Sequence, residues 1–280
     1  MTPISSPGFS MGPALLFCPA DRPERFAKAA ERADAVILDL EDAVSPDAKA
    51  EARLNLADVP LDPDRTIVRV NSAGPTLSSG DFEADLEALE ATPYRTVMLA
   101  KAESADQLAL LRQYRVIALC ETAAGVLAAP SIAAEPNAVA LMWGAEDLVA
   151  SLGGTSSRAG DGAYRAVALH ARSSVLIAAG ACGKAAIDAV YTDIPDLDGL
   201  AAESADAVAS GFAAKACIHP SQVAAVRAAY APTPEAIEAA RELLAAAQDA
   251  GAGVFQFRGK MIDGPILRHA EAVLRRAGVD

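Results

Sequence analysis

The sequence predicts an α/β fold, a single (β/α)₈ barrel followed by a helical extension. Three observations support this prediction: the chain has 280 residues, it contains eight short apolar runs, and longer amphipathic stretches separate those runs. A chain of this length suits one α/β barrel or two smaller domains, and eight is the number of strands that a closed parallel barrel needs. We therefore expect the barrel in residues 1–230 and the extension in residues 231–280.

The eight apolar runs are short and rich in β-branched residues, as expected of strands that are buried on both faces of a sheet. They occupy residues 14–20, 35–41, 66–71, 96–101, 115–121, 138–144, 186–193 and 214–220. Hydrophobic residues make up 52% of the chain and aromatic residues only 5%, so the core must consist mainly of Ala, Val, Leu and Ile. Such a composition suits helices packed on a parallel sheet.

The stretches between the runs predict helices. Residues 21–33 and 104–114, for example, begin with Asp or Ser and continue with strong helix formers, as N-capped helices do. The longest gap, from Gly144 to Ala186, begins with a Gly/Ser-rich stretch at residues 151–162, a loop that could cover a site.

Two more helical segments, residues 234–251 and 263–278, follow the eighth run and are joined by the short apolar piece 254–262. A barrel of eight strands and their helices is complete without these two segments. An extension of this kind either packs on a neighbouring subunit or caps its own barrel, and the residues alone leave both arrangements open.

Charge and composition exclude several classes of function. The net charge of −13 argues against nucleic acid as a partner, because a phosphate backbone would be repelled. The sequence contains no run of about 18 apolar residues, so we expect no membrane span. The amino-terminal stretch does not resemble a signal peptide. The cysteines form no C-x-x-C pair and have no His at zinc-finger spacing, so we expect a reducing cytoplasmic setting. We interpret three of them as small core residues, namely Cys18, Cys120 and Cys217.

Polar side chains collect where the predicted strands end, which in a parallel barrel is the face that carries the reactive groups. The residues concerned are Asp39, Glu41 and Asp42 after the second run, Arg69 in the third, Lys101 after the fourth, Glu121 after the fifth and Asp147 after the sixth.

Glu121 and Asp147 end consecutive runs, and neighbouring strands lie about 4.8 Å apart, so their carboxylates could meet on one ion. Two carboxylates completed by water and substrate oxygens describe a Mg²⁺ site, with Mn²⁺ as the alternative ion. The competing interpretation is that each acid only caps the helix that follows it.

Two further residues allow two interpretations each, and a third allows one. Arg69, in an apolar strand, either pairs with Asp39 or Glu41 or holds a substrate carboxylate. Lys101 either forms a Schiff base with a carbonyl substrate or an ion pair, and the crowding carboxylates favour the ion pair because they keep the ammonium protonated. Asp263, by its sequence context, is an N-cap followed by Pro265 in the first turn.

Five ordered motifs together resemble one family, the citrate lyase β-subunit-like (CitE-like) group of the citrate/malyl-CoA lyase (HpcH/HpaI aldolase) family. They are ILDLEDAV at 37–44, VRVN at 68–71, ALCETAAGV at 118–126, WGAEDLVASLGG at 143–154 and CIHPSQ at 217–222. The resemblance covers nearly the whole chain, including LFCPADRPERFAKA near its start and MIDGPIL near its end. It implies a (β/α)₈ TIM barrel of the phosphoenolpyruvate/pyruvate superfamily type.

The resemblance also implies an activity and a set of roles. Stand-alone members cleave β-hydroxyacyl-CoA thioesters such as malyl-CoA or citramalyl-CoA into a 2-oxo acid and an acyl-CoA, whereas true β-subunits act on citryl-acyl-carrier protein beside partner chains. Glu121 and Asp147 would bind Mg²⁺, and Arg69 would contact the substrate carboxylate. Asp263 would do acid-base work across a subunit boundary, which places the extension at an interface of a homotrimer or larger homo-oligomer.

The remaining acids and Lys101 complete the predicted site. We assign Glu41 a catalytic role and place Asp42 and Lys101 beside the substrate, with Glu41 and Asp42 ordering the waters of the metal. No phosphate loop or basic cluster marks the contacts with CoA, so a thioester of CoA and one of a carrier protein both stay open.

Overall fold

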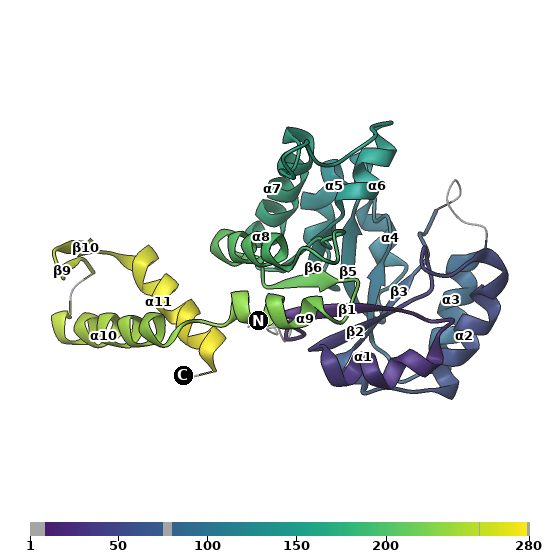
Figure 1. The fold of residues 1–280 in the computed structure, drawn as a ribbon, viewed down its shortest axis with the longest axis horizontal. Coiled ribbons are helices and arrows are strands. Elements are labelled where there is room, and N and C mark those ends of the chain that lie inside the picture. Colours follow the sequence, from purple (N-terminus) through teal and green to yellow (C-terminus); the bar gives the residue numbers. More distant parts are fainter. Residues whose placement is uncertain (1–8, 75–79, 252, 279–280) are drawn as a thin grey trace. The chain divides into compact units, whose positions relative to one another are not determined.

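In the computed structural model, which describes residues 9–74, 80–251 and 253–278, eight parallel strands close into a barrel (Figure 1). Each strand pairs with the next in sequence, and β8 pairs with β1 through Leu15 and Ala216. The strands are β1 Ala14–Pro19, β2 Ala35–Asp39, β3 Thr66–Val70, β4 Thr96–Leu99, β5 Arg115–Cys120, β6 Ala138–Trp143, β7 Ala185–Asp188 and β8 Ala214–Cys217. The predicted fold class is therefore confirmed. Each strand lies within its predicted run, except that β7 begins one residue earlier.

The strands are buried on both faces, which explains their nearly continuous apolar sequences. All residues of β2, β3, β4, β6 and β8 are buried. The interior of the barrel holds small and branched side chains, among them Ile37, Ile67, Ile117, Ala140 and Ala216. The interpretation of Cys18, Cys120 and Cys217 as core residues is also confirmed, since all three are buried.

Helices follow the strands. They are α1 Phe26–Arg32, α2 Lys49–Asp58, α3 Asp81–Glu90, α4 Ala105–Ala109, α5 Ala123–Ala133, α6 Ala145–Ser151, α7 Ala166–Ala181, α8 Leu197–Ser210 and α9 Gln222–Tyr230, with 3₁₀ turns at Pro23–Arg25, Pro46–Ala48 and Pro63–Arg65. The helix predicted over residues 104–114 is shorter than expected. It begins with a capping box between Ser104 and Gln107 and ends at Ala109.

The strands end earlier than the sequence suggested, and this places the site residues in the connections that follow them. β2 ends at Asp39, so Glu41 and Asp42 lie in the next turn, and Asp147 lies in the first turn of α6. The predicted loop at 151–162 lies between α6 and α7.

A second compact unit begins at Arg227. It contains α10 Pro234–Ala250 and α11 Gly264–Ala277, which confirm the two predicted helices and share a small core of Ala240, Ala270 and Val273. The apolar piece between them forms an antiparallel hairpin, β9 Phe255–Phe257 and β10 Lys260–Ile262. Among the described residues, no helix is long and apolar enough to cross a membrane.

Candidate active site

Two carboxylates of the protein itself fix the side chain of Arg69. In the barrel register it lies opposite Asp39 on the neighbouring strand, and its Nε and Nη2 donate to the two carboxylate oxygens of Asp39 at 2.7 and 2.5 Å. Its Nη1 lies 2.9 Å from Oε2 of Glu41. Burial alone would lower the pKa of Arg69, but the charge of Asp39 and the hydrogen bonds with it raise that pKa above its ordinary value. The guanidinium therefore stays protonated.

Lys101 is surrounded by acids, as the ion-pair interpretation predicted. Its Nζ forms ion pairs with Glu41, with Asp42 at 3.1 Å and with Asp147 at 3.7 Å. Burial acts to lower the pKa of Lys101, but the hydrogen bond and the charge of Glu41 outweigh it and raise that pKa. A protonated amine is not a nucleophile, so this environment disfavours Schiff-base formation.

Glu121 directly follows β5 and is almost fully buried, with 3% of its surface exposed. Its Oε1 accepts a hydrogen bond from the backbone N–H of Lys101 at 3.1 Å. Burial and the charge of Asp147 raise the pKa of Glu121 to about 8, although Arg69 acts to lower it. The alternative interpretation of Glu121 as a helix cap is wrong, because the neighbouring Thr122 caps α5 by accepting from the N–H of Gly125.

Gly144 leaves room for Glu121. The strand register pairs Cys120 with Trp143, so Gly144 lies beside Glu121. A Cβ atom added at Gly144 would come within 2.8 Å of both Cβ and Oε2 of Glu121, closer than such atoms approach one another. The residue at this position must therefore be a glycine for Glu121 to keep its place.

The pair Glu121 and Asp147 fits a divalent cation. The two side chains follow consecutive strands and repel each other, and Glu121 makes no ion pair among the residues that the structure describes. The described residues contain no ready-made cluster of three or more His, Cys, Asp or Glu side chains. Two carboxylates with the remaining positions left to water and substrate oxygens are a usual arrangement for Mg²⁺.

A cavity of about 340 Å³ opens above these residues. Its lining includes acids, Arg69 and apolar side chains. The acids are Asp39, Asp42, Glu121, Glu146 and Asp147, and the apolar side chains are Phe17, Leu119, Met142, Val190 and Ile218. The Arg69 guanidinium also lies 4.9 Å from the centre of the Phe17 ring. The structure thus pairs Arg69 with acids, as one interpretation predicted, and places it at a cavity of substrate size, while its contact with a substrate carboxylate stays a prediction.

The sequence did not single out two residues of this region. Glu146 lines the cavity, and its position next to Asp147 was the available signal. Asp85 on α3 is fully buried, accepts hydrogen bonds from Arg53 and Asn71, and so supports the end of β3. The available signal for Asp85 was its charge at a position of an amphipathic helix where the pattern predicts an apolar core residue.

Asp263 belongs to the second compact unit, where it occupies the N-cap position of α11 with Pro265 in the first turn. Its side chain makes no capping hydrogen bond. The capping position is as predicted, and the role of Asp263 in catalysis stays a prediction.

Comparisons with known proteins agree with this geometry. Residues 14–220 match the HpcH/HpaI aldolase/citrate lyase family, and residues 164–280 match a family of C–C bond lyases of the TIM-barrel fold. A citrate lyase subunit beta-like protein of Mycobacterium tuberculosis is 57% identical over 95% of this chain and 96% of its own. The mitochondrial citramalyl-CoA lyase of Mus musculus is 35% identical over 94% of this chain and 85% of its own.

A solved structure shares the whole architecture. The protein CitE of Mycobacterium tuberculosis, in complex with magnesium, acetoacetate and coenzyme A, superposes with a TM-score of 0.89. It is 56% identical, and the match covers 96% of this chain and 99% of that one. With the closed barrel and the acidic cavity described above, these matches show that the chain belongs to the HpcH/HpaI aldolase/citrate lyase family and is a carbon–carbon lyase of the citrate lyase β-subunit-like class.

Proposed function

We propose that this protein is a Mg²⁺-dependent lyase that cleaves a β-hydroxyacyl-CoA thioester into a 2-oxo acid and acetyl-CoA. Citramalyl-CoA, malyl-CoA and citryl-CoA are the proposed substrates. The observation that carries the proposal is that Glu121, Asp147 and Arg69 line one cavity. The magnesium and coenzyme A in the similar CitE structure support it.

In this proposal Glu121 and Asp147 hold the metal, and Arg69 binds the carboxylate of the substrate. When bound, Mg²⁺ would supply Lewis-acid stabilisation of the charge that develops on the 2-oxygen. Arg69 is already oriented by Asp39 and Glu41, so it presents its remaining N–H groups in a fixed direction. Asp42 and Lys101 flank the substrate.

The chain then has to move two protons. We assign Glu41 as the group that takes the hydroxyl proton, because it lies beside Arg69 and because burial raises its pKa above the ordinary value although Arg69 and Lys101 act to lower it. Loss of that proton breaks the C–C bond, which releases the 2-oxo acid and leaves a thioester enolate. Asp263, from the same or a neighbouring subunit of a homo-oligomer, donates a proton to the enolate carbon and so completes acetyl-CoA.

The test is an assay of the purified protein with Mg²⁺ against the three thioesters, with detection of released pyruvate, glyoxylate or oxaloacetate. Turnover should disappear in excess EDTA and in Glu121→Ala. Glu31→Ala, which removes an exposed acid on α1, serves as the control and should keep full activity. Retained turnover in Glu121→Ala or in EDTA would refute the proposal.

A second candidate function is that of a citrate lyase β subunit, which acts on citryl-acyl-carrier protein beside partner chains. The name of the relative from Mycobacterium tuberculosis favours it. The purified chain would then be inactive on all CoA thioesters and gain activity only with carrier and transferase subunits. A third candidate, a Schiff-base aldolase, requires that borohydride in the presence of pyruvate add mass to Lys101.

A further inference from the structure

The loop of residues 152–165, between α6 and α7, is attached to the barrel by very few side chains. From Ser151 to Ala163 every residue is exposed except Ser157, which is buried, and Arg158, which is half-buried. Hydrogen bonds between Ala159 and Ala163 and between Ser157 and Arg165 close the loop on itself but do not tie it to the barrel. Its placement therefore depends on Ser157, Arg158 and the half-buried Tyr164.

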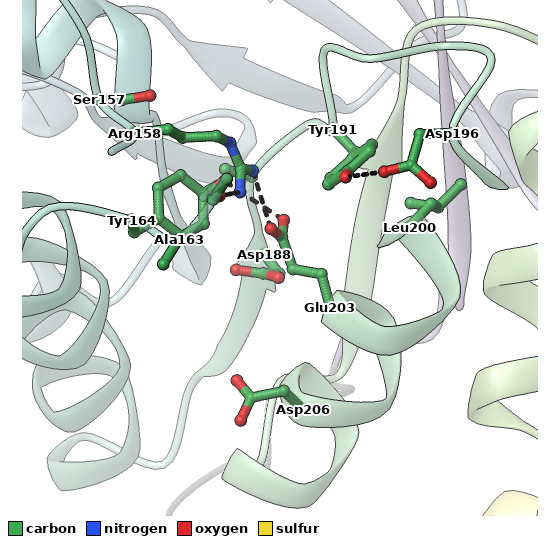
Figure 2. A network of polar contacts seen from close by, with 12 residues as sticks. Ser157, Arg158, Ala163, Tyr164, Asp188, Tyr191, Asp196, Leu200, Glu203 and Asp206 are labelled. Atoms are coloured by element: carbon green, nitrogen blue, oxygen red, sulfur yellow. Dashed lines mark hydrogen bonds and ion pairs between the residues drawn. The ribbon is translucent and has the colours of Figure 1, made fainter. Parts of the chain in front are cut away.

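Arg158 makes the first attachment. Its Nη2 lies 2.8 Å from Oε2 of Glu203 on α8, and its guanidinium stacks over the ring of Tyr164 at 3.7 Å (Figure 2). The other oxygen of Glu203 accepts from Nζ of Lys215, a fully buried lysine of β8. Because the hydrogen bond from Lys215 fixes Glu203, Arg158 binds a carboxylate that is itself held in place.

Ser157 makes the second attachment, and it reaches the active site. Its hydroxyl donates to Oε1 of Glu146 at 2.5 Å. Glu146 lines the cavity and directly precedes Asp147 in the first turn of α6. Ser157, which precedes Arg158, thus restrains Glu146, which precedes the proposed metal ligand Asp147.

A ring contact connects the same loop to the strand that leads into the site. Tyr164 packs edge-on against Trp143 with 5.2 Å between ring centres, and Trp143 donates to Asp188 at 2.7 Å. Trp143 ends β6, immediately before Gly144 and the Glu146–Asp147 turn. The loop therefore contacts the region of Asp147 at both Trp143 and Glu146.

We propose that Arg158 is a positioning residue of the active site: by binding Glu203 it holds the loop where Ser157 restrains Glu146 beside Asp147. This inference rests on the proposed function, because it assumes that Asp147 binds the metal. Three cations, Arg158, Arg172 and Lys215, form ion pairs with three acids, Asp188, Glu203 and Asp206, in this network. Figure 2 labels Arg158 and the three acids. Arg158 is the member of the network that belongs to the loop.

The test compares Arg158→Ala, Arg158→Lys and Ser157→Ala with the wild-type protein. Binding of Mn²⁺ is measured by electron paramagnetic resonance of the free ion, so the readout does not depend on turnover. We expect the Mn²⁺ dissociation constant to rise about tenfold in Arg158→Ala and in Ser157→Ala. Arg158→Lys should recover part of the affinity, because a lysine can still pair with Glu203 but lacks the planar stack on Tyr164.

Asp206→Asn is the matched control. It removes an exposed acid from the Arg172 end of the same network and leaves both loop attachments intact, so its Mn²⁺ affinity should equal that of the wild type. Trp143 is the single tryptophan of the chain, and its emission should move to longer wavelength in Arg158→Ala as Tyr164 loses its place.

Each result separates the two proposals. If Arg158→Ala and Ser157→Ala bind Mn²⁺ as the wild type does, the loop is structural only and the inference is overturned while the proposed function stands. If the wild type itself binds no Mn²⁺, the proposed function fails. Should Arg158→Ala not fold, wild-type Mn²⁺ affinity in Ser157→Ala still overturns the inference, because this variant breaks the hydrogen bond to Glu146 through which Arg158 would act.

Discussion

The backbone N–H of Lys101 donates to the carboxylate of Glu121, and the backbone of Lys101 is left-handed, with φ of 49°. Residues other than glycine rarely adopt this conformation, since Cβ comes too close to the backbone. The surrounding acids hold the Lys101 side chain, so backbone strain is retained at the site where it orients a proposed metal ligand.

This strain predicts a difference between two variants that both lose the ammonium group. Lys101→Gly should be more stable than Lys101→Ala by about 1 kcal/mol, because glycine tolerates a positive φ. Urea denaturation of the two proteins measures the difference. Equal stability, or a more stable alanine variant, would show that the left-handed backbone costs nothing here.

The raised pKa of Glu121 predicts how the metal-free protein responds to pH. A carboxyl with a pKa of about 8 in the fold and an ordinary value of 4.5 binds more protons folded than unfolded between these limits. Stability should therefore fall as pH rises from 4.5 to 8, by up to about 1.4 kcal/mol per pH unit. Glu121→Gln should flatten this slope in EDTA, and denaturation midpoints across the pH series measure it.

Gly144→Ala should displace Glu121 and weaken metal binding, because the new Cβ would overlap the Glu121 side chain. We expect a loss of affinity of about tenfold or more, measured by Mn²⁺ titration. Gly180→Ala, in α7 with open space around its Cβ position, is the control and should bind normally. An unchanged affinity in Gly144→Ala would mean that Glu121 does not need this gap.

Asp188 should be important for stability. It is fully buried and binds Lys215, Arg172 and the indole N–H of Trp143, so Asp188→Asn leaves buried cations without their counter-charge. The expected loss is about 3–5 kcal/mol. Asp206→Asn, at the exposed end of the network, should cost only about 0–1 kcal/mol.

The pKa of Asp188 adds a pH dependence to this network. Although burial acts to raise it, Lys215 and Arg172 lower it below the ordinary value. The stability from this ionised carboxylate is complete above the unfolded pKa of 3.8 and is lost as pH falls through the lower folded value. Acid denaturation of Asp188→Asn should lack this component, and an identical acid transition in both proteins would speak against it.

Asp263 acting across a subunit boundary predicts complementation. Asp263→Ala and Glu121→Ala should each be inactive alone, and mixed oligomers formed by refolding the two together should regain part of the activity. The assay of the mixture measures this. If the mixture stays inactive while refolded wild type is active, Asp263 either serves its own barrel or has no catalytic role.

The strands and the cluster of charged residues at their ends could be predicted from the sequence because both are local patterns. Eight apolar runs specify eight buried strands, and the rule that reactive groups follow barrel strands selects Arg69, Lys101 and Glu121. The exact ends could not be predicted, since residues 189–193 continue the apolar pattern of β7 although the strand stops at Asp188.

Sequence reasoning predicted the contacts of Arg69 with Asp39 and Glu41 but missed the contacts between distant segments away from the strand ends. The pairing of Arg158 with Glu203 joins residues 45 positions apart, and neither neighbourhood in the sequence indicates the other. One signal was present and unused: Lys215 interrupts the buried strand β8, and a lysine without exposure requires an anion nearby. Such a residue predicts that a partner exists but not where in the chain it lies.

The clamp of Asp39 and Glu41 on Arg69 has a consequence for turnover. The conformational entropy of this long side chain is lost when the protein folds, so substrate binding does not have to order it again. The same two counter-ions share the positive charge of the guanidinium and weaken its hold on any one carboxylate. If Arg69 binds the substrate carboxylate, as the proposed function requires, this arrangement favours fast recognition and ready release over tight retention.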